Sequence, residues 1–207
     1  CHSATMANTA LTDVPRYIYG TTRLGDGSIP FEQRVRVAGL GIAATGWIHT
    51  SHQYGDALSV LRAALEQDRS AFQGAIFKIG WDDPAQIREQ VELQLEALGM
   101  SSMPIGQLCL GENLSRELAE GGPNIEALQQ LKRSGLVGRF VLEVFPWTSA
   151  RPLQALQAGR ALDLVDGLIF YLNPLQRFAI NDLWRRIAEE DVPVVAMRTV
   201  CGGNVHA

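Results

Sequence analysis

A tyrosine and a lysine are placed where they could act together in proton transfer. Tyr54 follows the apolar run Gly46–Thr50 by four residues, and Lys78 ends the next apolar run, Gly74–Lys78. A nearby ammonium favours the phenolate form of a tyrosine, so Tyr54 would become a better proton donor or acceptor near neutral pH. The two residues therefore indicate acid/base chemistry.

Two histidines precede this tyrosine. His49 and His52 are three residues apart at the end of the first run and in the loop after it. Imidazole titrates near neutral pH, so either histidine could serve as an acid or base, or both could simply bind loop carbonyl groups. Zinc would need a third ligand, and Cys109 is expected inside a strand, so the pattern predicts no metal site.

Further candidates share one feature, which is that each lies at or after the carboxyl end of a predicted strand. They are Arg23, Trp81, Glu112, Glu143, Trp147, Asn173 and Arg198. Arg23, Lys78 and Arg198 could converge on a carboxylate or phosphate, with Glu143 as general base for an acidic carbon beside it. The tryptophans could wall a ligand pocket. Solvated loop positions would explain several of these residues without any function.

The elements that must position these residues alternate between short apolar runs and amphipathic segments. The predicted strands are Tyr17–Tyr19, Gly46–Thr50, Gly74–Lys78, Ile105–Leu110, Gly138–Val144, Gly167–Leu172 and Pro193–Met197. Apolar residues at helical spacing lie between them, as in Ile87, Val91, Leu95 and Leu98. This alternation is typical of βα units around a parallel sheet.

Two parallel folds fit a repeat of this kind. An open doubly wound sheet usually carries a Gly-rich phosphate loop after its first strand, but Gly20 and Gly25 do not form that motif. A (β/α)8 barrel of the TIM type is the alternative, with its chemistry at the carboxyl ends of the strands. The pattern by itself leaves both open.

Composition limits the remaining possibilities. The 207 residues are 46% hydrophobic and carry a formal net charge of -4, without a dense basic run, so a nucleic-acid partner is not expected. No stretch is long and apolar enough for a membrane span. The three cysteines suggest neither a disulfide framework nor a zinc module, and a cytoplasmic location fits best. Residues 1–5 look like an expression remnant, and residues 6–207 are expected to form one domain.

The segment Trp47 to Gly55, which reads WIHTSHQYG, resembles the second βα unit of the aldo-keto reductases. The surrounding order is similar too, including YGTTRLG at Tyr19–Gly25, FKIG at Phe77–Gly80 and DVPVVA at Asp191–Ala196. The resemblance covers nearly the whole chain and implies a (β/α)8 barrel. Only seven strands are readable, so we expect a barrel that is truncated or incompletely closed.

The chain departs from that family at several functional positions. Of the Asp, Tyr, Lys and His tetrad, Tyr54 and Lys78 match, while His49 occupies the aspartate position and Gly111 or a neighbour the histidine position. The stretches Leu142–Val144 and Leu168–Phe170 replace the family's contacts to the nicotinamide carboxamide. The resemblance therefore implies a degenerate catalytic tetrad.

The lost aspartate leaves two interpretations of Lys78. Without a counter-ion, burial would depress the pKa of Lys78, and a neutral amine could act as a base or Schiff-base nucleophile. Alternatively, Glu112 or Glu143 pairs with Lys78, and the group is only structural.

We therefore expect an aldo-keto-reductase-like protein that uses no nicotinamide and performs isomerase, epimerase or lyase chemistry on a small anionic or sugar-like substrate. An NADPH-dependent reductase of carbonyl compounds is the first alternative, and a non-catalytic binding partner is the second. A homo-oligomer is a further expectation, because an open barrel would expose strand edges that a second subunit could cover.

Overall fold

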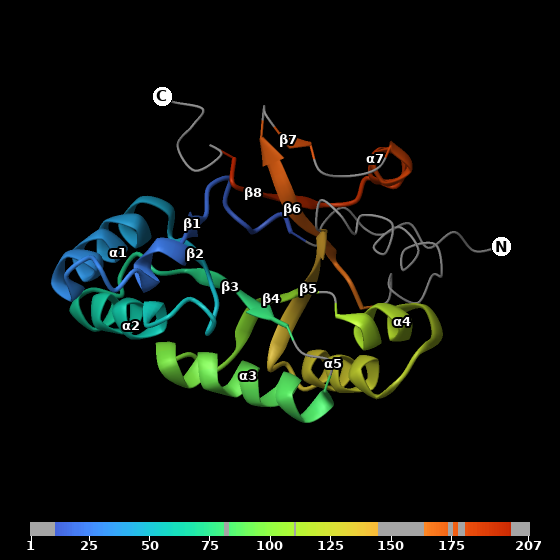
Figure 1. Cartoon of the computed structure of the whole chain (residues 1–207), viewed down its shortest axis with the longest axis horizontal. Coiled ribbons are helices and arrows are strands. Elements are labelled where there is room, and N and C mark those ends of the chain that lie inside the picture. The colour runs from blue at the N-terminus through green and yellow to red at the C-terminus, as the bar shows by residue number, and fades with distance from the viewer. Residues whose placement is uncertain are drawn as a thin grey trace.

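The computed structural model describes residues 11–80, 83–109, 111–144, 164–173, 176–177 and 181–199. They form a curved sheet with helices around its outer side (Figure 1). Its parallel strands are, in spatial order, β1 (Tyr19–Gly20), β2 (Trp47–Thr50), β3 (Gly74–Ile79), β4 (Met103–Leu108), β5 (Val137–Val144), β6 (Gly167–Asn173) and β8 (Val194–Met197). The two-residue strand β7 (Gln176–Arg177) pairs with β6 in the antiparallel sense.

Helices connect most of the neighbouring parallel strands. They are the 3-10 turn η1 (Thr22–Gly25) and helices α1 (Phe31–Thr45), α2 (Ala57–Gln67), α3 (Pro84–Leu98), α4 (Glu112–Glu120), α5 (Pro123–Arg133) and α7 (Asn181–Glu189). The start of α3 shows why the sequence folds this way locally. The Asp83 carboxylate accepts hydrogen bonds from the amides of Ala85 and Gln86, and Pro84 occupies the first turn, where it needs no partner. Gly99 then ends the helix with a left-handed backbone (φ 61°).

The core lies on both faces of the sheet because side chains alternate along each strand. Phe77, Phe140 and Phe170 are fully buried between the strands and the surrounding helices. The opposite face, inside the curve, carries a separate buried cluster of Trp47, Ile76, Ile105, Val141 and Ile169. Such two-sided burial is typical of parallel strands that consist of continuous apolar runs.

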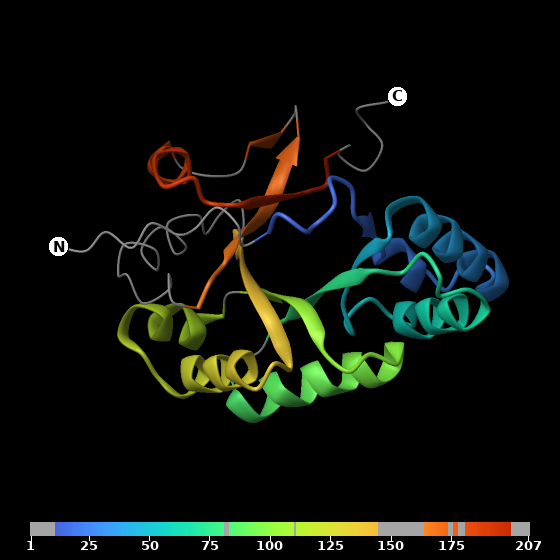
Figure 2. The same cartoon turned by 180° about the vertical axis from the view of Figure 1, so that it is seen from behind.

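The barrel is not closed by the described strands. Strand β1 pairs with β2 and β8 pairs with β6, and no pairing among the described residues joins β8 to β1. A groove of about 540 Å³ lies between the segment before β1 and the β8 region. It is lined by Leu11, Thr12, Val14–Ile18, Pro193–Ala196 and Thr199. The reverse view in Figure 2 shows the same open curve. The expected incompletely closed barrel is confirmed, whereas coverage of its edges by a second subunit stays a prediction.

Two details differ from the sequence-based expectation. The first strand spans Tyr19–Gly20 rather than Tyr17–Tyr19, because only those two residues pair with β2, and Tyr17 is instead largely exposed. The hairpin strand β7 had no periodic signal, since it is two residues long. Within the described residues, no helix combines the length and apolar character needed to cross a bilayer.

Candidate active site

The side chains inside the barrel change from apolar to polar along each strand. Each member of the apolar inner cluster is followed, two positions later in its strand, by a more polar residue. We call these five residues the polar layer: His49, Lys78, Gln107, Glu143 and Tyr171. A step of two residues keeps a side chain on the same face of a strand. The polar layer therefore lies above the apolar cluster, towards the carboxyl ends of the strands, where barrels of this type hold their active sites.

Lys78 and Glu143 form an ion pair within the polar layer. The Lys78 Nζ to Glu143 Oε1 distance is 3.5 Å, and the Glu143 side chain is fully buried while that of Lys78 is 18% exposed. Burial by itself would lower the pKa of Lys78, but the charge of Glu143, with weaker help from Cys109 and Tyr54, raises it above its ordinary value. The amine is thus held protonated.

This pair decides between the two interpretations of Lys78. The hypothesis of a neutral lysine is wrong, because a carboxylate from β5 supplies the charge that the His49 position lacks. Of the two proposed counter-ions, Glu143 is the one in contact, whereas Glu112 is exposed at the start of α4. Lys78 is therefore an ammonium group, and a Schiff-base role is not supported.

Tyr54 lies beside this ion pair. It belongs to the loop between β2 and α2, and its half-buried ring has its centroid 5.8 Å from Lys78 Nζ and 6.4 Å from the centroid of the His49 ring. The ammonium group thus lies within cation–π distance of this ring. The expected proximity of Tyr54 and Lys78 is confirmed.

His49 is bound to a glutamine that sequence reasoning missed. His49 Nε2 and Gln107 Oε1 are 2.5 Å apart, and burial lowers the pKa of His49. In the neutral ring, Nε2–H donates to the Gln107 oxygen, which leaves Nδ1 as an acceptor. Gln107 had no motif, and only its position two residues after the inward-facing Ile105 could have identified it.

His52 occupies a different environment from His49. Its backbone amide donates to Gln94 Oε1 at 3.1 Å, and burial lowers the pKa of its ring. Its Nδ1 is buried without a partner among the described residues. His52 therefore helps to hold the loop before Tyr54, while His49 lies in the polar layer.

Cys109 is a second residue whose position sequence reasoning did not exploit. It follows β4, and its amide donates to the carbonyl of Ile79 at 2.9 Å. Burial, with the negative charge of Glu143, raises the pKa of the thiol well above its ordinary value. Cys109 is thus a protonated side chain beside the ion pair rather than a reactive thiolate. No group of three or more potential metal ligands occurs in the part of the chain that the structure describes.

The remaining candidates are spread around the barrel mouth. Arg23 is 88% exposed and lies 3.9 Å from Asp26. Asn173 is buried and donates to the carbonyl of Arg198, whose guanidinium lies 4.9 Å from the centroid of the Tyr171 ring. Arg23, Lys78 and Arg198 thus have separate neighbours, and their convergence on one anion stays a prediction. Trp81 and Trp147 lie outside the described residues.

The positions implied for a nicotinamide carboxamide hold one polar residue, Glu143, among apolar ones. Leu142 and Val144 are buried against the helices, and Ile169 belongs to the apolar inner cluster. None of these side chains can donate or accept a hydrogen bond. Apart from Glu143, these positions offer no side-chain hydrogen bond to that group.

The chain matches no protein-family model and no curated protein sequence. It does resemble solved structures. These include the glycerol dehydrogenase of Gluconobacter oxydans (TM-score 0.71, 20% identity, 90% of this chain and 60% of that one). An aldo/keto reductase of Klebsiella pneumoniae in complex with NADP and acetate gives a TM-score of 0.69 at 18% identity over 91% of this chain and 65% of that one. The aldo-keto reductase of Bacillus halodurans in its holo form gives a TM-score of 0.69 at 17% identity over 92% of this chain and 64% of that one.

The chain thus spans less than two thirds of these three proteins while nearly all of it is covered. The order of parallel strands agrees with that likeness. Identities below a quarter establish the fold and leave the activity open. The chain has the fold of the aldo-keto reductases.

Proposed function

We propose that the chain catalyses proton transfer on a small hydroxylated carbonyl compound, of the isomerase or epimerase type, without a nicotinamide. The observation that carries this proposal is the Lys78 ammonium group, which is paired with the buried Glu143 and lies 5.8 Å from the centroid of the Tyr54 ring. This arrangement places a phenol, which can donate a proton to a carbonyl oxygen, beside a fixed positive charge that could stabilise developing negative charge.

The proposed step is an enolisation. Tyr54 donates its proton to the carbonyl oxygen while His49 Nδ1 removes a proton from the neighbouring carbon, which yields an enediol. The protonated His49 then gives its proton to the former carbonyl carbon while the Tyr54 phenolate takes the proton of the hydroxyl group on the other carbon, which completes an isomerisation. Protonation of the original carbon on its opposite face, with Tyr54 taking back the proton that it gave, completes an epimerisation. In both cases the two side chains regain their starting states. The neutral His49 ring, whose Nε2 is bound to Gln107, is suited to act as this base.

The polar layer also supports a hydroxylated substrate. Gln107 Nε2 is a buried donor and Glu143 Oε2 a buried acceptor, and neither has a hydrogen-bond partner among the described residues. Leaving such groups unpaired is costly, and a hydroxyl group accepts one hydrogen bond and donates another. A sugar-like hydroxy aldehyde or hydroxy ketone therefore matches this layer.

Solvent exchange tests the proposal without knowledge of the product. The protein is incubated with a panel of small hydroxy aldehydes, hydroxy ketones and their acids and phosphates in D2O, and deuterium on the carbon beside the carbonyl is followed by NMR. We expect exchange with the wild-type protein and a loss of roughly a hundredfold or more in Tyr54→Phe and in Lys78→Met, since each removes part of the acid catalyst.

The matched control for Lys78→Met is Lys132→Met. Lys132 also pairs with a carboxylate, Asp166, but outside the barrel. Exchange that survives in Tyr54→Phe at the wild-type rate would exclude the proposed mechanism.

An NADPH-dependent carbonyl reductase is the second candidate. It is favoured by one observation, the likeness in fold to a Klebsiella pneumoniae structure in complex with NADP. Titration with NADPH, followed by quenching of tryptophan fluorescence, separates the two candidates. Saturable binding together with oxidation of NADPH that depends on a carbonyl compound would replace the first proposal by the second.

A further inference from the structure

The loop that carries Tyr54 is anchored on both sides of this residue by buried side chains from two different helices. We propose that Arg34 of α1 and Gln94 of α3 are positioning residues that fix Tyr54 against Lys78. This inference rests on the proposed function for its catalytic meaning, while the anchoring itself can be measured separately.

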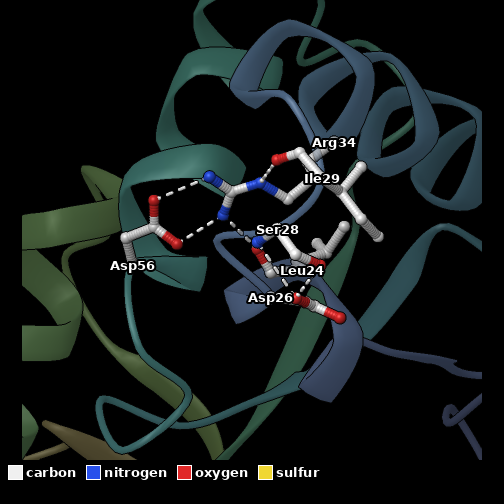
Figure 3. Close-up of polar contacts among 6 residues, drawn as sticks. All are labelled: Leu24, Asp26, Ser28, Ile29, Arg34 and Asp56. Atoms are coloured by element: carbon white, nitrogen blue, oxygen red, sulfur yellow. Dashed lines mark hydrogen bonds and ion pairs between the residues drawn. The ribbon is translucent and has the colours of Figure 1, made fainter.

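Arg34 anchors the side that follows Tyr54 (Figure 3). Its side chain is only 6% exposed, and its guanidinium binds both carboxylate oxygens of Asp56, with an Nη2 to Oδ2 distance of 3.0 Å. The same group donates to the carbonyls of Leu24 at 2.6 Å and Ile29 at 2.9 Å. A planar guanidinium with fixed donors holds all three acceptors in one geometry. Arg34 thereby ties the loop after β1 to the loop that carries Tyr54.

The two loops also touch directly through their backbones. A Cβ atom at Gly25 would lie 2.0 Å from the carbonyl oxygen of Tyr54, so no other residue fits there without displacing the loop. The amide of Tyr54 donates to the Ser51 carbonyl, and the Tyr54 carbonyl accepts from Ala57. The backbone of Tyr54 is therefore confined by a turn and by the facing loop.

Gln94 anchors the side that precedes Tyr54. Its fully buried side chain accepts a hydrogen bond from the His52 amide at 3.1 Å and donates one to the Lys78 carbonyl, also at 3.1 Å. One glutamine thus connects the Tyr54 loop to the end of the strand that carries Lys78. Because the same amide group binds the backbones of His52 and Lys78, it holds the loop that leads to Tyr54 against the end of β3.

Matched variants are available for both anchors. Gln90 lies one turn before Gln94 on α3 and is also buried, but its side chain accepts from the Gly80 amide and does not reach the Tyr54 loop. The exposed pair Arg62–Glu66 on α2 is the control for Arg34–Asp56. The variant Gln94→Met is therefore compared with its control Gln90→Met. The variants Arg34→Met and Asp56→Ala are compared with the control Glu66→Ala.

The first measurement is ¹⁹F NMR of protein labelled with 3-fluorotyrosine. The chain has four tyrosines, and Tyr54→Phe assigns the Tyr54 signal. We expect this signal to shift or broaden in Gln94→Met, Arg34→Met and Asp56→Ala while the other tyrosine signals stay in place, and to stay unchanged in both controls. Asp56→Ala replaces Arg34→Met if the latter fails to fold, because Asp56 is 46% exposed and its removal disturbs less packing.

The second measurement is the rate of substrate exchange described above. In the three anchor variants we expect kcat to fall by up to about a hundredfold with KM within about twofold of wild type, because a misplaced proton donor slows the chemical step. An unshifted Tyr54 signal in folded anchor variants would overturn the inference. A shifted signal in a protein that catalyses no exchange would uphold the anchoring and reject the proposed function.

Discussion

The chain contains two lysine–carboxylate pairs that look alike and differ in what surrounds them. Lys132 and Asp166 approach to 2.7 Å on the outer side of the sheet, with side chains 29% and 20% exposed. Lys78 and Glu143 lie 3.5 Å apart inside the barrel, and the carboxylate is completely buried. By distance alone, the outer pair is the tighter of the two.

Hydrogen bonding separates the two pairs more sharply than distance does. Lys132 also donates to the Leu164 carbonyl, and Asp166 also accepts from the Phe140 amide, so the outer pair connects α5 to β5 and to the segment before β6. In the inner pair, Glu143 Oε2 has no partner among the described residues. The outer pair is satisfied by the fold, whereas the inner pair keeps hydrogen-bonding capacity for another molecule.

The largest predicted effect is on stability when the inner carboxylate is removed. Glu143→Leu leaves the Lys78 ammonium buried without a counter-ion, and we expect the free energy of unfolding to fall by about 3 kcal/mol, since breaking one side of a buried pair is more costly than its attraction suggests. Urea unfolding followed by circular dichroism measures this loss.

A double variant sharpens this prediction. Lys78→Met combined with Glu143→Leu removes both charges, and we expect most of the lost stability to return while solvent exchange stays abolished. A double variant as unstable as Glu143→Leu would show that packing around Glu143, rather than the orphaned charge, causes the loss.

The strand pattern was predictable because buried parallel strands leave continuous apolar runs, and six of the seven predicted strands coincide closely with observed ones. Tyr54 and Lys78 were found through family resemblance to a local segment. Neither signal could predict which carboxylate neutralises Lys78, because the Lys78–Glu143 contact crosses β4 and joins residues 65 apart in the chain.

The roles of Gln107, Gln94 and Arg34 were also beyond sequence reasoning. Each is a single polar residue in an ordinary strand or helix, and its meaning depends on a partner brought close by the curvature of the sheet. Gln107 faces His49 across β3, while Gln94 and Arg34 reach loops next to their helices. For Arg34 in α1 and Gln94 in α3, the burial of a polar side chain is the only feature that would indicate such a role, and burial is not visible in the sequence.

A further prediction is that the folded protein loses stability at acidic pH because of its histidines. Burial lowers the pKa of His49 and, for the same reason, that of His52, so the unfolded chain binds protons on them more readily than the folded chain. Stability should therefore be complete above the ordinary histidine pKa of 6.5 and decline as the pH falls below it. His49→Gln should flatten this decline, as measured by urea unfolding at several pH values.

The dependence of stability on alkaline pH tests the contribution of the Lys78 ammonium group. Its folded pKa lies above the ordinary value of 10.5, so the stabilisation that comes from its protonated form is complete below 10.5 and is lost as the pH rises through the raised folded value. We expect wild-type protein to lose more stability than Lys78→Met over this alkaline range. Equal losses would mean that the ammonium group contributes no net stabilisation.

The smallest predicted effect belongs to the outer pair. Lys132→Met removes an ion pair that is partly exposed, and such pairs contribute at most about 1 kcal/mol because solvent screens them and ordering two side chains costs entropy. Asp166 would keep its hydrogen bond from the Phe140 amide, so its carboxylate would not be left without a donor. We therefore expect near-wild-type unfolding and unchanged solvent exchange. A loss of exchange in Lys132→Met would contradict the division between an outer structural pair and an inner functional one, since no contact of Lys132 reaches the polar layer in the described structure.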